Sequence, residues 1–281
     1  MNLNQVKEKG FHILFGVMAV VSILCVALIC IFLFANGIPA IGEIGIFKFL
    51  LGRTWAPNNI PASFGIFPMI IGSIYVTVGA VIIGVPIGIL TAIYMSHFCP
   101  AKLYKPLKSA VDLLAGIPSI VYGFFGMMVL VPMFRSSVLS ASILLGIMIL
   151  PTIISVSESS IQAVPGSYYE GAVGLGASHE RSVFFAVVPA AKSGILAGVI
   201  LGVGRALGET MAVVMVAGNQ PVIPNSLFKG VRTLTANIVL EMGYAEGLHR
   251  EALIATAVVL FVLILMINFG FSQIKKRGDA A

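Results

Sequence analysis

Six long apolar runs dominate this sequence, and each is long enough to cross a lipid bilayer as a helix. A helix needs about 20 apolar residues to span the hydrocarbon core of a membrane. Barrel strands would be about half that length and would alternate in polarity, which these runs do not. Helices also satisfy their own backbone hydrogen bonds, as lipid requires. The predicted transmembrane helices are residues 11–36, 67–97, 106–134, 139–163, 190–218 and 251–272.

The composition agrees with a membrane protein. Of the 281 residues, 58% are hydrophobic and 10% are charged, whereas a water-soluble domain carries about 25% charged residues. The chain therefore has too little polar surface to cover a globule in water. We predict an all-α integral membrane protein with six transmembrane helices in a single domain, residues 1–281.

The lysines and arginines between the runs predict how the chain lies in the membrane, because such residues favour cytoplasmic loops. With the N-terminus inside, ten lie on the inner side and six on the outer side. The inner set is Lys7, Lys9, Lys102, Lys105, Lys108, Arg181, Lys192, Lys275, Lys276 and Arg277, and the outer set is Lys48, Arg53, Arg135, Lys229, Arg232 and Arg250. Both termini are therefore predicted to be cytoplasmic. The net charge of +6 requires no nucleic-acid partner, because the inner loops account for much of it.

Two charged residues interrupt the fifth apolar run. Arg205 comes 13 residues after Lys192, which marks the inner edge of the run, so a helix would carry it about 20 Å deeper. An arginine near the bilayer centre costs about 2.5–3.5 kcal/mol on insertion scales, so it should face a polar interior. Glu209 follows four residues later and would share the same face of a continuous helix.

Two roles are open for Arg205 and Glu209. They could form an internal ion pair that holds the helix in register. Alternatively, Arg205 could present its guanidinium to an anion while Glu209 orients it, since the guanidinium donors form a rigid fork that suits oxyanions. Ionisable residues inside a membrane mark substrate pathways by default. We therefore expect both residues to line a substrate pathway, and the two roles are compatible.

Other residues within the runs have simpler interpretations. Glycines at 194, 198 and 202 lie on one helix face, and Gly204 with Gly208 forms a second pair; such stripes permit close helix packing. Gly116 and Pro118 should break or bend the third helix. Glu158 and Asp112, which follows Lys108 by four residues, are expected to form structural pairs near the inner surface.

The outer loops add two expectations. Trp55 lies in residues 37–66, the first outer loop, and is expected to sit at the membrane interface, where tryptophan is enriched. Residues 219–250 form a second, polar outer loop, with a short re-entrant or surface helix expected around residues 233–242.

No segment has the features of an energy-coupling or catalytic site. The phosphate-binding loop of ATPases is absent, and no Cys/His cluster has metal-ligand spacing. The spans contain no His-Glu-x-x-His, Ser/Lys or paired-Asp arrangement. We therefore predict that this chain is not an enzyme and binds no cofactor or metal of its own. If it belongs to a pump, the motor is another polypeptide that grips an inner loop, and residues 164–189 form the only sizeable one.

That loop resembles the signature of permease subunits of ATP-binding-cassette (ABC) importers. The signature reads Glu-Ala-Ala, three residues, Gly, and about a dozen residues later Pro. The matching residues are Glu170, Gly171, Ala172, Gly176 and Pro189, with Gly171 replacing the first alanine. The resemblance implies that residues 165–189 are a cytoplasmic loop whose coupling helix sits in a groove of an ATPase subunit. It also implies a type I ABC importer (MetI-like) permease fold with a core of about residues 67–272.

Further segments resemble the phosphate-specific branch of these permeases, the PstC type. They are Trp55-Ala-Pro, Phe64-Gly-Ile, Leu-Ala-Gly-Ile-Pro-Ser-Ile-Val-Tyr-Gly-Phe-Phe-Gly from Leu114, Gly-Arg-Ala-Leu-Gly-Glu-Thr-Met-Ala-Val from Gly204, and Leu-Glu-Met-Gly from Leu240. The resemblance implies import of inorganic phosphate through a multi-pass protein of the cell (cytoplasmic) membrane. The implied partners are a second permease of the PstA type, two ATPase subunits that bind ATP and magnesium, and an extracytoplasmic phosphate-binding protein.

Two alternative functions remain open at this point. The membrane part could pass another oxyanion, such as sulfate or molybdate, because the binding protein would do most of the selecting. The chain could also act alone as a channel or an ion-coupled carrier.

Overall fold

The structure is a computed structural model that describes residues 3–279, with side chains described for residues 11–273. The helices are α1 Leu3–Ile44, α2 Ile46–Leu51, α3 Phe67–Ile93, α4 Ala101–Gly116, α5 Ser119–Phe125, α6 Val131–Phe134, α7 Val138–Gln162, α8 Gly166–Gly174, α9 His179–Ser182, α10 Val188–Ala190, α11 Lys192–Gly208, α12 Met211–Val216, α13 Leu234–Glu241 and α14 Gly247–Asp279. Three π-helical turns are η1 Tyr94–Phe98, η2 Gly126–Leu130 and η3 Val183–Val187, and the strands are β1 Trp55–Ala56 and β2 Ser63–Phe64. Five of the lysines and arginines that predict the orientation, Lys7, Lys9, Lys275, Lys276 and Arg277, lie outside the described side chains.

Within the described residues, four helices are long and apolar enough to cross a membrane alone, and two further spans are bent pairs. The four are Phe11–Ile44, Phe67–Phe98, Val138–Gln162 and Gly247–Gln273, and the pairs are Ala101–Gly116 with Ser119–Phe134 and His179–Ala190 with Lys192–Gly208. If each bent pair counts as one span, the described chain has six spans, as the sequence predicts.

The third span bends by 97° between Gly116 and Ser119. Ile117 has an extended backbone (φ −70°, ψ 126°) and Pro118 follows it. A proline ring disfavours the helical conformation in the residue before it, so α4 ends here. The break predicted at Gly116 and Pro118 is confirmed.

The prediction of one helix over residues 190–218 is wrong. Helix α11 ends at Gly208, Glu209 is extended (φ −69°, ψ 130°), and α12 begins only at Met211. The chain also bends by 69° just before Lys192. Mean hydropathy does not reveal these breaks, because apolar residues continue on both sides of each one.

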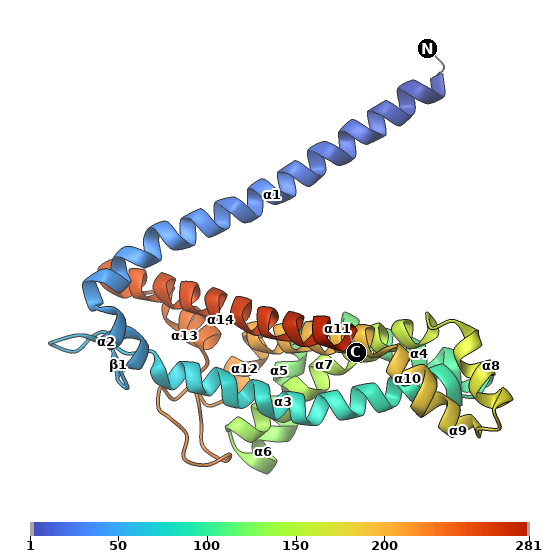
Figure 1. Cartoon of the computed structure of the whole chain (residues 1–281). Helices are drawn as coiled ribbons and strands as arrows, with labels where there is room; N and C mark the ends of the chain where they lie inside the picture. Colours follow the sequence, from blue (N-terminus) through green and yellow to red (C-terminus); the bar gives the residue numbers. More distant parts are fainter. Residues whose placement is uncertain (1–2, 280–281) are drawn as a thin grey trace.

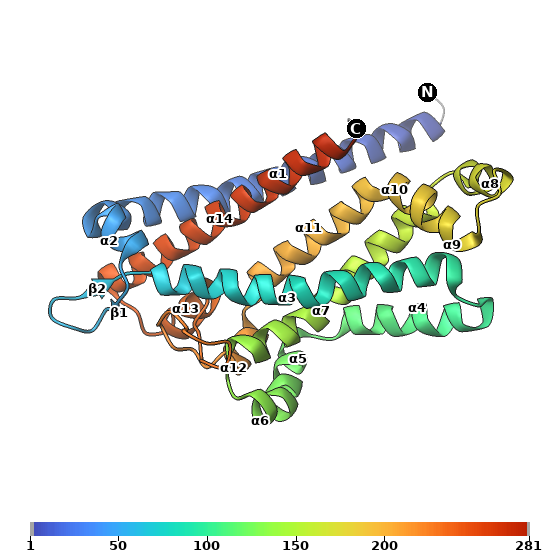
Figure 2. The same cartoon turned by 60° about the horizontal axis from the view of Figure 1, so that its bottom comes forward.

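Short elements lie at two opposite ends of the molecule (Figure 1). One end carries α2 and the β1–β2 hairpin, and we refer to it as the hairpin end. The other carries α8 and α9, and we refer to it as the α8 end. Helix α1 begins and α14 finishes on the side of the α8 end in both views (Figures 1 and 2).

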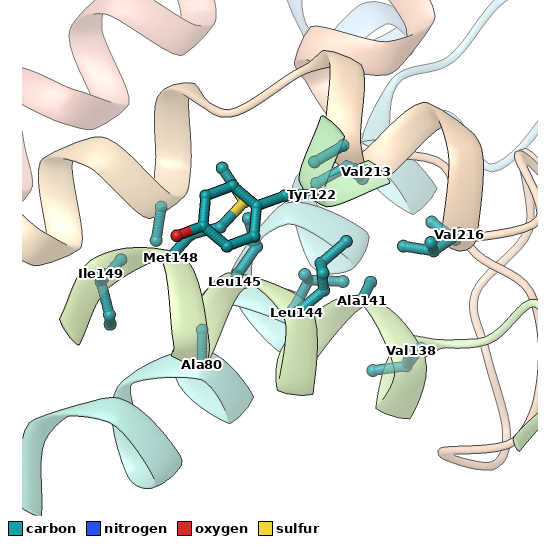
Figure 3. Packing of buried hydrophobic residues seen from close by; sticks show 14 of the residues in the cluster. Ala80, Tyr122, Val138, Ala141, Leu144, Leu145, Met148, Ile149, Val213 and Val216 are labelled. Atoms are coloured by element: carbon teal, nitrogen blue, oxygen red, sulfur yellow. The ribbon is translucent and has the colours of Figure 1, made fainter. Parts of the chain in front are cut away.

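Helices α3, α7 and α11 pack closely through small residues. A Cβ atom at Gly88 of α3 would lie 2.8 Å from Ile153 of α7, and one at Gly202 of α11 would lie 2.9 Å from the same side chain. A Cβ at Gly194 would lie 2.4 Å from the Cβ of Ser160. The predicted face of glycines at 194, 198 and 202 is therefore confirmed as a packing face against α7. Figure 3 shows the neighbouring apolar cluster, which continues to α12.

Helix α1 diverges from this bundle and touches it near one end (Figure 1). A Cβ at Gly37 would meet Val258 of α14 at 2.7 Å, and the Phe34 and Phe261 rings meet edge-on with centroids 6.0 Å apart. Most apolar side chains of α1 are exposed in the chain by itself. Their surface is suited to lipid or to another membrane subunit.

Candidate translocation and coupling sites

Arg205 lies in the last turn of α11 and is half-buried. Its Nη1 donates a hydrogen bond to Thr152 Oγ1 of α7 at 3.4 Å. A guanidinium has five N–H donors, and this is its one hydrogen bond within the described side chains. No carboxylate among residues 11–273 lies within 4.0 Å of it. The remaining donors are therefore available to a ligand or a partner subunit.

Glu209 lies beyond the end of α11, so the expectation that it shares a helix face with Arg205 is wrong, and the internal ion pair, one of the two open roles, is not formed in this structure. Its Oε1 accepts hydrogen bonds from the backbone N–H groups of Thr210 at 3.1 Å and Ala212 at 3.3 Å. The first N–H groups of a helix have no intrahelical partner and favour a negative charge. The carboxylate thus stabilises the start of α12 instead of pairing with the arginine.

The break at Glu209 is held in place by α13. Thr235 Oγ1 donates to the carbonyl oxygen of Glu209 at 3.1 Å, and the Leu234 backbone N–H donates to Ser73 Oγ of α3 at 3.0 Å. Thr235 and Leu234 are buried. The short helix expected around residues 233–242 is confirmed as α13, and it packs into the spans beside the break.

The face of α11 that carries Arg205 is not covered by the described chain. Cβ atoms at Gly204 and Gly208 would have no neighbour within 4 Å, and Leu201 and Met211 are exposed. Residues three and four apart share a helix face, so Leu201, Gly204 and Gly208 surround Arg205. The second glycine pair therefore does not serve close packing within this chain.

A buried polar cluster at the hairpin end was not predicted. Glu241 accepts hydrogen bonds from Trp55 Nε1 at 2.8 Å, Arg232 Nη1 at 2.5 Å and His249 Nε2 at 2.9 Å. Trp55 is only 7% exposed, so its expected role as an anchor in the membrane interface is wrong: its indole packs inside the protein and donates to a buried carboxylate. Trp55 and Glu241 are 186 residues apart in sequence, so no local spacing indicates the contact.

The structural pairs expected near the inner surface are confirmed. Glu158 is 1% exposed and accepts from Lys108 Nζ at 2.8 Å and from the Tyr104 hydroxyl at 2.6 Å. Lys108 also lies 3.9 Å from Asp112. These contacts join α4 to α7.

The residues of the coupling signature gather at the α8 end. Glu170, Gly171 and Ala172 lie in α8, which has no buried residue. Gly176 has a φ of +87°, the left-handed conformation that favours glycine just after a helix. Pro189 lies in α10, just before the bend into α11.

The exposed side chains of α8 include apolar ones. Tyr168 and Val173 are exposed, and Leu175, the residue that follows α8, is 92% exposed. No side chain from the described chain lies within 4 Å of a Cβ built at Gly171 or Gly176. An exposed helix with protruding apolar residues has the shape of a docking element. Among the described residues, no group of three His, Cys, Asp or Glu side chains is placed to hold a metal.

Residues 84–277 match the family described as "Binding-protein-dependent transport system inner membrane component". A "Probable ABC transporter permease protein YqgH" from Bacillus subtilis is 36% identical over 96% of this chain and 93% of its own length. A "Phosphate transport system permease protein PstC" from Mesorhizobium japonicum is 35% identical over 92% of this chain and 86% of its own length. The fold resembles a chain of the methionine ABC transporter MetNI in an inward-facing conformation, with a TM-score of 0.60, 19% identity, and coverage of 74% of this chain and 93% of that one.

Proposed function

The chain belongs to the family of inner-membrane components of binding-protein-dependent transport systems, and we propose that it carries inorganic phosphate into the cytoplasm as a permease subunit of an ATP-driven ABC importer. It is a multi-pass protein of the inner membrane, and it is a transport subunit, with ATP hydrolysis assigned to its partners. The functional unit is the whole chain, residues 1–281, with its permease core at about residues 67–272. Relatives similar along most of the chain are named as phosphate transport permeases.

The observation that carries the proposal is the half-buried Arg205 on an uncovered face of α11. Its guanidinium makes one described hydrogen bond, to Thr152, and its free donors can bind two oxygens of phosphate at once. An arginine inside a span is costly unless it faces a polar space. We place the phosphate pathway along this face, between this chain and a second permease.

Glu209 also belongs to this pathway, but its role differs from that of an ion-pair partner. It caps α12 one residue beyond the end of α11, and so fixes the backbone break beside Arg205. Leaving Arg205 without an internal carboxylate keeps its charge available to the anion.

The α8 end, the Arg205 face and the hairpin end are each assigned a partner. An ABC importer includes ATPase subunits. We propose that the complex contains two of them, that both bind ATP and magnesium, and that α8 docks into one. Glu170, Gly171, Ala172, Gly176 and Pro189 form this coupling loop. A PstA-type permease covers the Arg205 face, and an extracytoplasmic phosphate-binding protein delivers the anion at the hairpin end. In this orientation the α8 end and both termini are cytoplasmic.

The proposal is tested by replacing Arg205 in the complete complex, reconstituted in lipid vesicles. Arg205→Ala should abolish phosphate uptake while assembly and ATP binding persist, and Arg205→Lys should recover only part of it, because an ammonium lacks the bidentate fork. Arg250→Ala is the matched control, since Arg250 is exposed at the hairpin end. Normal uptake by Arg205→Ala would refute the pathway role.

A second candidate is the import of another oxyanion, such as sulfate or molybdate. The same guanidinium supports this candidate, because its N–H donors can bind any tetrahedral oxyanion of similar size. Measuring which anion, loaded on the binding protein, stimulates ATP hydrolysis by the assembled complex separates the two candidates. Uptake by the purified chain without an ATPase would instead support a channel or carrier.

A further inference from the structure

Helix α8 is attached to the rest of the described chain mainly through Tyr169. The other residues of α8 are exposed apart from the half-buried Ala172. Tyr169 packs at the edge of an apolar cluster that includes Val183 and Val187. Its hydroxyl lies 2.9 Å from His179 Nδ1, the one hydrogen bond between an α8 side chain and another element among the described side chains.

His179 continues this attachment to the end of α3. Its Nε2 lies 3.2 Å from the carbonyl oxygen of His97 in η1, the turn that follows α3. A carbonyl can only accept, so Nε2 donates, and Nδ1 of the neutral ring then accepts from the Tyr169 hydroxyl. The Phe98 ring packs edge-on against His179, with centroids 4.9 Å apart. One imidazole therefore joins α8 to a transmembrane helix with both of its nitrogens.

The connection along the backbone between α8 and α9 is weaker. It runs through Leu175, which is 92% exposed, and Gly176, around which the described chain leaves open space. The backbone N–H groups of Leu175, Gly176 and Ala177 all donate to carbonyl oxygens of α8 itself, so the hydrogen bonds of this turn stay within α8. The turn thus closes α8 without joining it to the transmembrane bundle, and the side-chain contacts of α8 are left to carry a displacement onward.

We propose that His179 is the positioning residue through which a displacement of α8 reaches the transmembrane bundle. From η1 the displacement enters α3, which packs on α7, and α7 packs on α11 through Ile153 and Gly202. Helix α11 carries Arg205. This inference rests on the proposed function, because it takes α8 as the helix that the ATPase moves.

The variants that test the proposal separate hydrogen bonding from ring packing. Tyr169→Phe removes only the hydroxyl, and His179→Phe keeps a ring but loses both hydrogen bonds. His179→Gln retains one acceptor and one donor, so it should restore much of the coupling. His12→Phe is the matched control, because His12 is exposed on α1.

The measurement is phosphate transported per ATP hydrolysed by the complete complex in lipid vesicles. Tyr169→Phe and His179→Phe should hydrolyse ATP at near wild-type rates. Tyr169→Phe should transport about fivefold less phosphate per ATP, the factor for one ordinary hydrogen bond, and His179→Phe, which loses two hydrogen bonds, should transport less still. His12→Phe should match the wild type.

Wild-type coupling in both variants would overturn the inference, and so would failure of His179→Gln to improve on His179→Phe, since ring packing alone would then explain the loss. If His179→Phe does not assemble, Tyr169→Phe decides, because it leaves every ring in place. A wild-type complex that transports no phosphate would instead refute the proposed function.

Discussion

Replacing Glu241 with alanine should destabilise the hairpin end more than any substitution of an exposed carboxylate there. The side chains of Glu241 and Arg232 are 8% and 15% exposed, so the substitution leaves a nearly buried guanidinium without its counter-charge. Breaking a buried ion pair in this way costs about 3–5 kcal/mol. Trp55 Nε1 and His249 Nε2 also lose their acceptor. Glu241→Gln should cost less, because the amide oxygen still accepts a hydrogen bond.

The assay is the free energy of unfolding of the purified chain in detergent. Glu246→Ala is the control, because Glu246 is exposed at the same end and surface substitutions change stability by about 0.5 kcal/mol or less. A double substitution, Arg232→Met with Glu241→Leu, should recover much of the loss, since replacing both partners of a buried pair is often neutral. If Glu241→Ala unfolds like Glu246→Ala, the cluster does not stabilise this end.

Two further predictions concern glycines. Gly171→Ala should stabilise α8 by about 1 kcal/mol, because a Cβ there meets no neighbour; slower amide hydrogen exchange over residues 166–174 would show it, and unchanged exchange would contradict it. On α11, Gly194→Ala should destabilise the chain by about 1–3 kcal/mol through its clash with Ser160. Gly204→Ala should leave the free energy of unfolding unchanged or raise it by up to about 1 kcal/mol. Equal effects at 194 and 204 would refute the assignment of the two faces.

The sequence predicts the spans and part of their geometry well, because those features depend on local physics. Apolar runs of bilayer length identify the six spans, and the effect of Pro118 on Ile117 locates the bend of the third. The spacing of the glycines at 194, 198 and 202 identifies the face that packs on α7. The coupling signature likewise falls on α8 and its capping glycine, Gly176.

The features that the sequence does not predict depend on contacts between distant segments. Periodicity alone favours a helix through Glu209, but the structure ends it there with contacts from Ala212 and from Thr235 of α13. Composition favours Trp55 at the membrane surface, but its buried indole donates a hydrogen bond to Glu241, 186 residues later in the sequence. Neither partner is identifiable until the fold places it.

The proposed function requires that Arg205 contact phosphate during transport. The most direct test is the distance between phosphate and the Arg205 guanidinium in a structure of the complete complex trapped with its substrate. We expect one or two phosphate oxygens at about 2.7–2.9 Å from Arg205 nitrogens, as in other charge-assisted hydrogen bonds. A carboxylate of either permease paired with Arg205 in that state, with phosphate bound elsewhere, would contradict it.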